Sequence, residues 1–315
     1  MTLHKYSGAG NDFIVIDGRY SDVSEYRCGS VISALCSRTD GFVAADGKIG
    51  ADGLMILSPS GSTDFRMEFF NPDGSGGMMC GNGGRCITAF ADKLGIVPGN
   101  GSEYVFEAAD GIHTAAILGK DGNVCTVRLK MIDPFDLHQC EEGWFVNTGT
   151  RHLVRFVDKL ETLDVATEGS RLRHLPAFAP EGVNIDFVFA PPLTRRVSTR
   201  PAVRVCCQSN IREQGAAGVA NVVETKFANQ GAEPLQIRTF EKGVEAETLA
   251  CGTGIVAAAV VHCHVNGLKP PQTVSVKAKQ NTLSVDIFPE GVWLTGPAEF
   301  VSNQKNLCHF PSGSV

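Results

Sequence analysis

Two cysteines stand in nearly the same short motif at distant points of the chain. Cys80 opens the run Cys80–Gly83 and Cys251 opens the run Cys251–Gly254, and both runs have the form C-G-x-G. A thiol acts as a base only as the thiolate, and the pKa of a free cysteine is about 8.5. Each motif leads into an apolar run that predicts a helix, and the unpaired N–H groups at a helix start stabilise an anion. Each motif therefore predicts a reactive thiol, and its glycines allow backbone amides to approach a bound carboxylate.

A pair of such thiols suits a reaction that inverts a stereocentre. One cysteine, as thiolate, would remove the α-proton of an amino acid, while the other, as thiol, would return a proton to the opposite face. Backbone amides at the two helix starts would stabilise the carbanion, so the pattern predicts inversion with no cofactor. A single cysteine at a helix start is more often structural, but two in matching contexts favour catalysis.

A dinucleotide-binding site is the competing interpretation of the second motif. Gly252, Gly254 and Ala257 have the spacing of the glycine-rich fingerprint of such sites. That fingerprint must follow an apolar strand directly, and the segment Glu245–Ala250 is not one. We therefore expect no nicotinamide cofactor.

The elements that must position the cysteines are mostly short β-strands separated by turn residues. Two longer stretches, Gly84–Leu94 and Gly254–Val265, are apolar nearly all round and predict buried helices directly after the cysteine motifs. A strand-like segment with phenylalanine near its end, Phe70 or Phe240, precedes each motif. This internal repeat predicts an α+β fold of two pseudo-symmetric domains, each a curved, mostly antiparallel sheet wrapped around a central buried helix.

The repeat also predicts the domain boundaries. One domain is expected over residues 1–132 together with a C-terminal segment of about 300–315, and it carries Cys80. The other is expected over residues 133–299 and carries Cys251. Residues of about 191–234 fit neither pattern and are interpreted as an insertion in the second domain.

Composition narrows the classes of partner. The chain has 315 residues and a net charge of −6, and its basic residues form no stripe, which argues against nucleic acid. The first residues lack the apolar core of a signal peptide, so we expect a cytoplasmic protein. The apolar stretch at 254–261 is too short to span a membrane, so no membrane partner is expected. The 11 cysteines show no ligand spacing, so no metal site is expected.

Several further motifs resemble those of the diaminopimelate epimerase family. Together they extend over nearly the whole chain apart from the insertion. They are Gly8–Phe13, Gly50–Leu54, Phe70–Ser75, Cys80–Cys86, Gly182–Asn184 and Thr248–Gly254.

The resemblance implies a function and a set of site residues. It implies interconversion of LL- and meso-diaminopimelate without pyridoxal phosphate, for lysine and peptidoglycan synthesis, by a protein that forms a homodimer. By position, Cys80 and Cys251 match the catalytic pair, and His152 and Glu241 match groups that tune the cysteines and hold the amine end of the substrate. The remaining matches are substrate-binding residues: Asn11, Asn71, Asn184 and Lys242, with the carboxylate-binding turns Gly81-Asn82 and Gly252-Thr253.

The chain departs from the family where the far end of the substrate would bind. Thr150 stands where the family often has an amide, Arg151 adds an unexpected charge, and Lys242 replaces an arginine. Lysine offers a point charge where arginine grips a carboxylate through two hydrogen bonds. A racemase of another amino acid, such as histidine, therefore remains an alternative. The insertion leaves a second alternative open, a non-catalytic ligand-binding protein.

Overall fold

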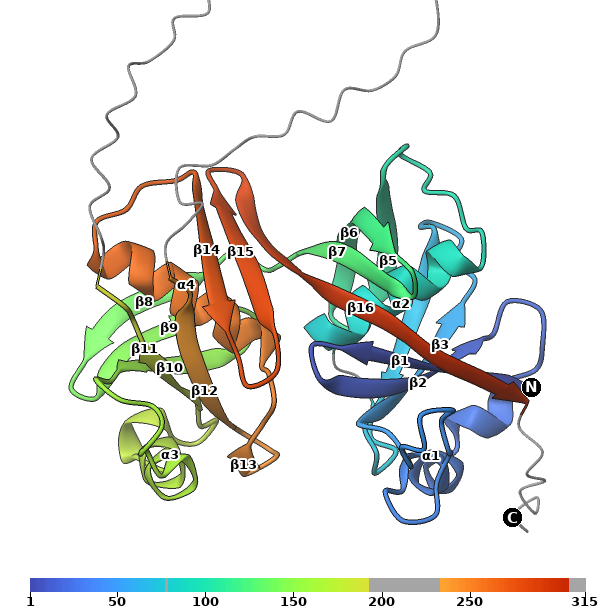
Figure 1. Cartoon of the computed structure of the whole chain (residues 1–315), viewed down its shortest axis with the longest axis horizontal. Helices are drawn as coiled ribbons and strands as arrows, with labels where there is room; N and C mark the ends of the chain where they lie inside the picture. The colour runs from blue at the N-terminus through green and yellow to red at the C-terminus, as the bar shows by residue number, and fades with distance from the viewer. Residues whose placement is uncertain (77–78, 193–232, 306–315) are drawn as a thin grey trace, which may run out of the picture.

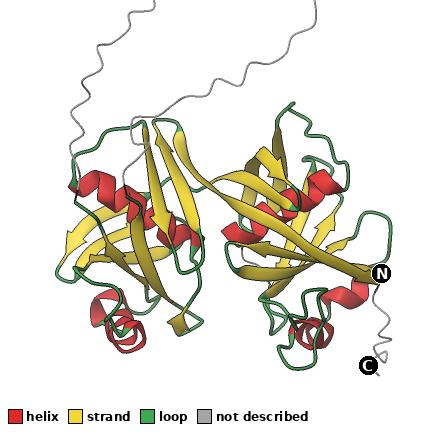
Figure 2. Ribbon diagram, viewed as in Figure 1, coloured by secondary structure: helices red, strands yellow, loops and turns green. Residues whose placement is uncertain are grey.

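A computed structural model describes residues 1–76, 79–192 and 233–305 of the chain. Most of the expected insertion, about 191–234, lies outside the described residues. The chain forms two lobes that share one 16-stranded sheet, with the helices inside and beneath it (Figures 1 and 2). The predicted α+β class is confirmed, as few helices accompany a mixed sheet in which four pairings of the described strands are parallel.

The first lobe is a closed barrel around one helix. Its strands follow the order β1-β2-β3-β4-β5-β6-β7-β16, and β16 pairs with β1 to close the ring. Helix α2 (Gly81–Lys93) runs through the barrel, while η1 (Ser24–Arg27) and α1 (Gly29–Cys36) pack outside it. The strands are β1 (Thr2–Gly8), β2 (Asn11–Asp17), β3 (Gly53–Ser58), β4 (Phe65–Phe70), β5 (Glu103–Ala108), β6 (Gly111–Asp121), β7 (Val124–Lys130) and β16 (Gly291–Lys305).

The second lobe is an open sheet curved around another helix. Its strands follow the order β8-β9-β10-β11-β12-β14-β15-β16, and the short β13 pairs with β12. Helix α4 (Gly252–Val265) runs through this lobe, with α3 (Val165–Arg173) and η2 (Pro176–Phe178) outside. The strands are β8 (Phe135–Cys140), β9 (Gly143–Asn147), β10 (Arg151–Phe156), β11 (Asn184–Phe189), β12 (Leu235–Glu241), β13 (Ala246–Glu247), β14 (Gln272–Lys277) and β15 (Thr282–Phe288).

Strand β16 belongs to both lobes. Its first part pairs with β15, its middle with β7 and its last part with β1, where Lys305 stands opposite Thr2. In Figure 1 it runs as one long arrow from one lobe to the other. One hydrophobic cluster includes buried residues of α2, of α4 and of the sheet around both helices.

Burial explains why most residues of these two helices are small or apolar. Every residue from Asn82 to Ala91 in α2 is buried, including Arg85 and Thr88. In α4 the buried run includes Gly254–Ala259. A helix surrounded by sheet must present apolar side chains in every direction, which is the pattern that predicted both helices.

Both helices begin earlier than the apolar pattern indicated. They begin at Gly81 and Gly252, so Cys80 and Cys251 are their N-cap residues. The sequence pattern did not predict α3 or the strands β1, β6 and β8 to β10. Among the described residues, no helix combines the length and apolarity needed to cross a membrane.

Candidate active site

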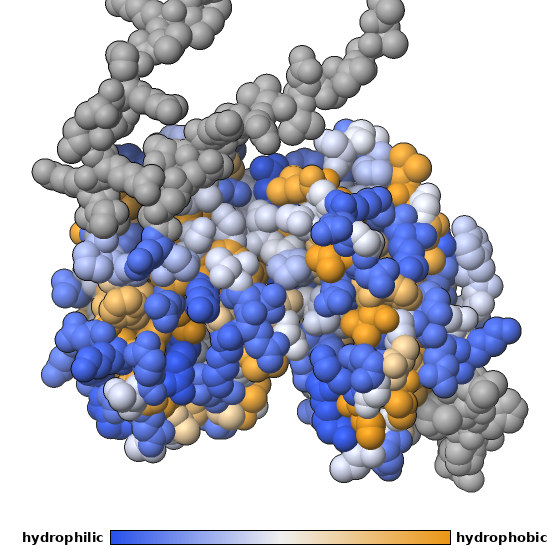
Figure 3. All heavy atoms as spheres, viewed as in Figure 1, coloured by the Kyte–Doolittle hydropathy of each residue, from blue (hydrophilic) through white to orange (hydrophobic). Residues whose placement is uncertain are grey.

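The two cysteine-capped helix starts meet between the lobes. A Cβ atom at Gly252 would lie 3.9 Å from the Cα of Gly81 and 3.9 Å from Oδ1 of Asn82. Asn82 also donates through Nδ2 to the carbonyl oxygen of Ala250 at 3.2 Å, one residue before Cys251. Figure 1 shows α2 and α4 each directing one end toward the other lobe, and Figure 3 shows a notch between the lobes below their contact.

Cys80 lies against the first turn of α2. Its Sγ accepts a hydrogen bond from the backbone N–H of Gly83 at 3.5 Å. Burial among its neighbours raises the pKa of the thiol, while the N–H groups of Gly83 and Asn82 and the charge of Arg85 lower it. The charge of Glu241 raises the pKa of Cys80 as well, so the carboxyl group of the second lobe acts on a thiol of the first.

Cys251 lies in a more negative environment than Cys80. Burial raises the pKa of its thiol well above the usual value, and the carboxylates of Glu241 and Asp186 raise it further. Its Sγ lies 3.3 Å from Oγ1 of Thr253, whose hydrogen bond lowers the pKa of the thiol. The two thiols therefore differ in their electrostatic surroundings, although both cap a helix.

Glu241 ends strand β12 beside the cysteines. Burial raises the pKa of its carboxyl group, and a hydrogen bond with Cys251 lowers it. The structure thus brings the predicted catalytic residues Glu241 and Cys251 into contact.

His152 is fully buried and touches the second helix start through a hydroxyl group. Its Nδ1 lies 2.7 Å from Oδ2 of Asp186, and neither side chain is exposed. Its Nε2 lies 2.8 Å from Oγ1 of Thr150 and 3.0 Å from Oγ1 of Thr253. The imidazole of His152 reaches Cys251 through the hydroxyl of Thr253.

Asn184 joins His152 to the segment after Glu241. Its Oδ1 accepts from the backbone N–H of Lys242 at 2.8 Å, and its Nδ2 donates to the carbonyl oxygen of Arg151 at 3.2 Å. The ammonium of Lys242 donates to the carbonyl oxygen of Glu181 at 3.0 Å. The guanidinium of Arg151 pairs with the Glu181 carboxylate at 2.8 Å, so its charge is balanced there.

Asn11 and Asn82 are hydrogen-bonded to each other on the first-lobe side of the candidate site. Nδ2 of Asn82 donates to Oδ1 of Asn11 at 2.7 Å, and Nδ2 of Asn11 donates to Oδ2 of Asp52 at 3.0 Å. Asn71, by contrast, hydrogen-bonds through its side chain to Ser75 in the turn after β4, at 3.0 Å. The contacts therefore connect Asn11, but not Asn71, to the predicted carboxylate-binding turn.

Two residues that the sequence did not single out belong to this arrangement. Arg85 is completely buried in α2, and its Nη2 donates to Oδ1 of Asn82 at 2.8 Å, which fixes the direction of that amide. Asp186 is completely buried beside His152. Each is a charge inside an apolar run, and that contrast is the signal by which the sequence marks them.

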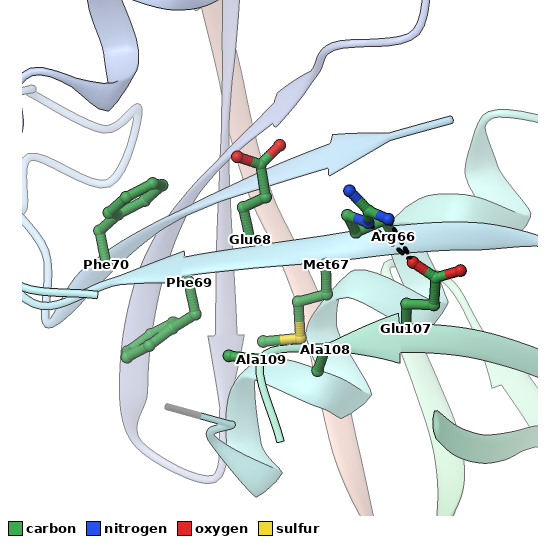
Figure 4. Close-up of a pocket in the computed structure, with 8 residues that line it drawn as sticks. All are labelled: Arg66, Met67, Glu68, Phe69, Phe70, Glu107, Ala108 and Ala109. Atoms are coloured by element: carbon green, nitrogen blue, oxygen red, sulfur yellow. Dashed lines mark hydrogen bonds and ion pairs between the residues drawn. The ribbon is translucent and has the colours of Figure 1, made fainter. Parts of the chain in front are cut away.

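A pocket elsewhere in the first lobe does not coincide with these residues. It has a volume of about 390 Å³, and neither cysteine lines it. Figure 4 shows it along β4, where Met67 and Phe69 point to one side, Glu68 points to the other and Arg66 reaches Glu107. We therefore place the candidate active site at the helix starts, where the polar groups converge. The residues lining the pocket are Arg66, Met67, Glu68, Phe69, Phe70, Glu107, Ala108 and Ala109.

Several solved structures have a similar fold at low sequence identity. The PhzF-family phenazine biosynthesis protein of Bacillus anthracis has a TM-score of 0.63 and 13% identity, with 98% of this chain and 99% of that chain covered. The hydroxyproline epimerase of Agrobacterium vitis has a TM-score of 0.59 and 15% identity, with 96% and 91% covered. At these identities the likeness shows the fold alone.

Comparison with sequence relatives identifies the family of this chain. The family model for diaminopimelate epimerase matches residues 3–131. The diaminopimelate epimerase of Flavobacterium psychrophilum is 35% identical over 306 residues, covering 96% of this chain and 98% of the relative. That of Chlorobaculum tepidum is 38% identical over 303 residues, covering 94% and 97%. The chain therefore belongs to the diaminopimelate epimerase family.

Proposed function

We propose that this protein is an isomerase that interconverts LL- and meso-diaminopimelate without a cofactor, in the synthesis of lysine and peptidoglycan precursors. The single observation that carries the proposal is the meeting of two cysteine-capped helix starts, Cys80 on α2 and Cys251 on α4, in a member of this family. Relatives named diaminopimelate epimerase that align with nearly the whole chain support the choice of substrate.

The proposed reaction moves one proton off the α-carbon and one proton onto it. One cysteine thiolate takes the α-proton and becomes a thiol, and the electron pair of the C–H bond stays on the α-carbon. The thiol of the other cysteine gives its proton to the opposite face and becomes a thiolate. The roles of Cys80 and Cys251 exchange in the reverse direction.

The backbone amides at the two helix starts would bind the α-carboxylate. The N–H groups of Gly81-Asn82 and Gly252-Thr253 lie in the first turns of α2 and α4, where amides lack helical partners. Two positive helix ends aimed at one carboxylate stabilise the negative charge that grows next to it during deprotonation. The contact between Gly252 and Asn82 supports a carboxylate site shared by both helices.

His152 and Glu241 would control the protonation of the cysteines. Glu241 contacts Cys251 and raises the pKa of both thiols, so it favours the protonated partner that the reaction needs. His152 reaches Cys251 through Thr253. Asn11, Asn71, Asn184 and Lys242 would bind the substrate, and the link between Asn184 and Lys242 supports a common role for these two.

We also propose that the two halves are pseudo-symmetric domains with the boundaries predicted above. The order of elements supports this: β2 to β4, α2 and β5 to β7 pair in the same sequence of parallel and antiparallel steps as β10 to β12, α4 and β14 to β16. On the family resemblance alone we propose a cytoplasmic homodimer, which light scattering and cell fractionation would test.

A racemase of another amino acid is the second candidate. It is favoured by Lys242, whose ammonium is bonded to the Glu181 carbonyl oxygen, and by Thr150, which hydrogen-bonds with His152 and Thr253. Neither side chain supplies the bidentate grip on a distal carboxylate that an arginine gives.

A substrate panel separates the two candidates. Reduced enzyme is incubated with LL-diaminopimelate, L-histidine and L-lysine in parallel, and the stereoisomers are separated by chiral chromatography. Conversion of LL- to meso-diaminopimelate with little change in the other two is expected. Racemisation of histidine or lysine with untouched diaminopimelate would favour the second candidate, and no conversion of any substrate would favour a binding protein.

A further inference from the structure

A fully buried carboxylate stands behind His152. Asp186, on β11, accepts a hydrogen bond from Oγ1 of Thr239 on β12 at 2.7 Å, and its other oxygen lies 2.7 Å from Nδ1 of His152 on β10. Neither Asp186 nor His152 is exposed to solvent. A buried carboxylate is costly unless its oxygens have partners, and here each oxygen has one.

This arrangement assigns the hydrogens on the imidazole ring. An ionised carboxylate only accepts hydrogen bonds, so Nδ1 of His152 carries a hydrogen that points at Asp186. Nε2 then faces the hydroxyl groups of Thr150 and Thr253 at 2.8 and 3.0 Å. The Thr253 hydroxyl lies 3.3 Å from the sulfur of Cys251, which completes a chain from carboxylate to thiol.

We infer that Asp186 is a positioning residue for the Cys251 half of the site: it holds His152 in one tautomer and stabilises the imidazolium that forms when His152 takes the proton of Cys251 through Thr253. In that step the S–H proton of Cys251 passes to Oγ1 of Thr253 while the Thr253 hydroxyl proton passes to Nε2 of His152. A thiolate and an imidazolium result, and no other bond changes.

The surroundings of Cys251 explain why this relay is needed. Glu241 on β12 and Asp186 on β11 are both negative groups that oppose a second negative charge on the Cys251 sulfur of α4. His152 on β10 is the group that can bring a positive charge through a direct hydrogen-bonded path. Once His152 is an imidazolium, it balances Asp186, as the buried aspartate does for the histidine in a catalytic triad.

The close approach of Asp186 to α4 supports its role at this helix start. A Cβ atom at Gly254 would lie 2.5 Å from Oδ1 of Asp186, so the glycine of the second C-G-x-G motif leaves room for the carboxylate. At the first helix start, the cation Arg85 of α2 lowers the pKa of Cys80. The two half-sites therefore reach a thiolate by different means.

The inference rests on the proposed function, and its test uses readouts that need no substrate. The variant Asp186→Asn keeps the size of the side chain and removes its charge. The full chain is reduced and labelled with iodoacetamide across a pH range, and the alkylation of each cysteine is followed by peptide mass spectrometry. We expect the alkylation midpoint of Cys251 to rise by about one to three pH units, because the loss of the His152 imidazolium outweighs the loss of repulsion from the Asp186 charge. The midpoint of Cys80 should stay unchanged.

Asp286→Asn is the matched control. Asp286 on β15 accepts a hydrogen bond from Thr273 at 2.7 Å across neighbouring strands, as Asp186 does from Thr239, but it has no contact with His152. It should leave both midpoints unchanged. In an active enzyme, Asp186→Asn should also lower kcat by at least about 100-fold with KM within a few-fold. An unchanged Cys251 midpoint in folded Asp186→Asn would overturn the inference.

A measurement on the unmodified protein covers the case in which Asp186→Asn does not fold. Nitrogen-15 NMR of the labelled imidazole of His152, assigned with His152→Gln, should show a protonated Nδ1 throughout the stable pH range. An unprotonated Nδ1 at neutral pH would contradict the role of Asp186. Because neither readout involves diaminopimelate, a failed substrate assay with these results intact would count against the proposed function alone.

Discussion

At the scale of residues, the site must hold two thiols in different protonation states although burial raises the pKa of both. The helix-start amides and Arg85 favour the thiolate of Cys80, whereas the charge of Glu241 favours the thiol of Cys251. A two-base inversion requires one cysteine as thiolate and the other as thiol. The unequal surroundings of Cys80 and Cys251 favour this combination.

Removal of the Glu241 charge should therefore lower the pKa of Cys251. In Glu241→Gln, the alkylation midpoint of Cys251 is expected to move to lower pH, because a negative neighbour that opposes the thiolate has gone. Activity should fall at the same time, since the thiol partner is lost. A midpoint that moves to higher pH would contradict the assigned direction.

The same variant should change how stability depends on pH. Burial raises the pKa of the folded-state Glu241 carboxyl above its unfolded value of about 4.3. The stability gained from neutral Glu241 is therefore complete below about pH 4.3 and is lost as pH rises through the folded-state pKa. The free energy of unfolding of Glu241→Gln, measured by urea denaturation between pH 4 and 8, should not show this loss. If it changed with pH in parallel with that of the unmodified protein, the prediction would be contradicted.

At the scale of elements, the helix starts are set by close packing around glycines. A side chain at Gly254 would strike Asp186, at 2.5 Å, whereas a Cβ at Gly81 would meet only the Cε of Met131, at 3.9 Å. Two glycines at different places in the matching motifs, Gly81 at the second position and Gly254 at the fourth, thus have different amounts of room around them. At Gly254 the room is limited by a charged group of the neighbouring sheet.

This difference predicts opposite effects of two alanine substitutions on stability. Gly254→Ala should lower the free energy of unfolding by about 1–3 kcal/mol, because the methyl group must displace Asp186 or the helix. Gly81→Ala should leave it unchanged or raise it by about 0.5–1 kcal/mol, because alanine is the better helix former. Denaturant titrations of both variants measure their free energies of unfolding, and an equal decrease in both variants would contradict the prediction.

The elements that could be predicted from the sequence are those marked by a pattern of neighbouring residues. Both cysteine motifs, both buried helices and the strand before each could be predicted because they lie in continuous apolar runs. Helix α3 could not, because Gly169 weakens its helical pattern; a Cβ there would lie 2.5 Å from the Cβ of Phe240, so close packing on β12 requires the glycine. The strand β8 has mostly exposed residues and lacks an apolar face.

Contacts that depend on the order of strands in the sheet could not be predicted from the sequence either. His152 and Asp186 meet because β10 and β11 are parallel neighbours, with His152 opposite Asn184. No spacing rule links residues 34 positions apart on two strands joined by an outer helix. The same holds for the bond between Arg85 and Asn82, whose importance depends on the second helix start lying beside Asn82.

At the scale of the whole molecule, the lobes are joined by shared structure and not by a linker alone. Strand β16 pairs with β15 of one lobe and with β7 and β1 of the other, and one hydrophobic cluster contains residues of α2 and α4. A site built from two helix starts needs this connection, because a small shift between lobes would separate the thiols from the substrate.

The shared strand predicts cooperative unfolding of both lobes. Thermal unfolding followed by calorimetry should give one transition, with equal calorimetric and van't Hoff enthalpies, because loss of β16 opens the first barrel and exposes the second sheet. Trp144 in the second lobe and near-ultraviolet signals of the first lobe should change together. Two separate transitions would show that the lobes fold independently.

The central claim is that Cys80 and Cys251 act on opposite faces of the α-carbon of diaminopimelate. Its most direct test is incubation with LL-diaminopimelate in D₂O for the unmodified protein, Cys80→Ser, Cys251→Ser and, as a control, Cys28→Ser at an exposed cysteine. We expect meso product with one solvent deuterium at the inverted carbon for the unmodified and control proteins, and inversion slowed at least about 100-fold in the other two. Full-rate inversion by either of those variants, or meso product without deuterium, would contradict it.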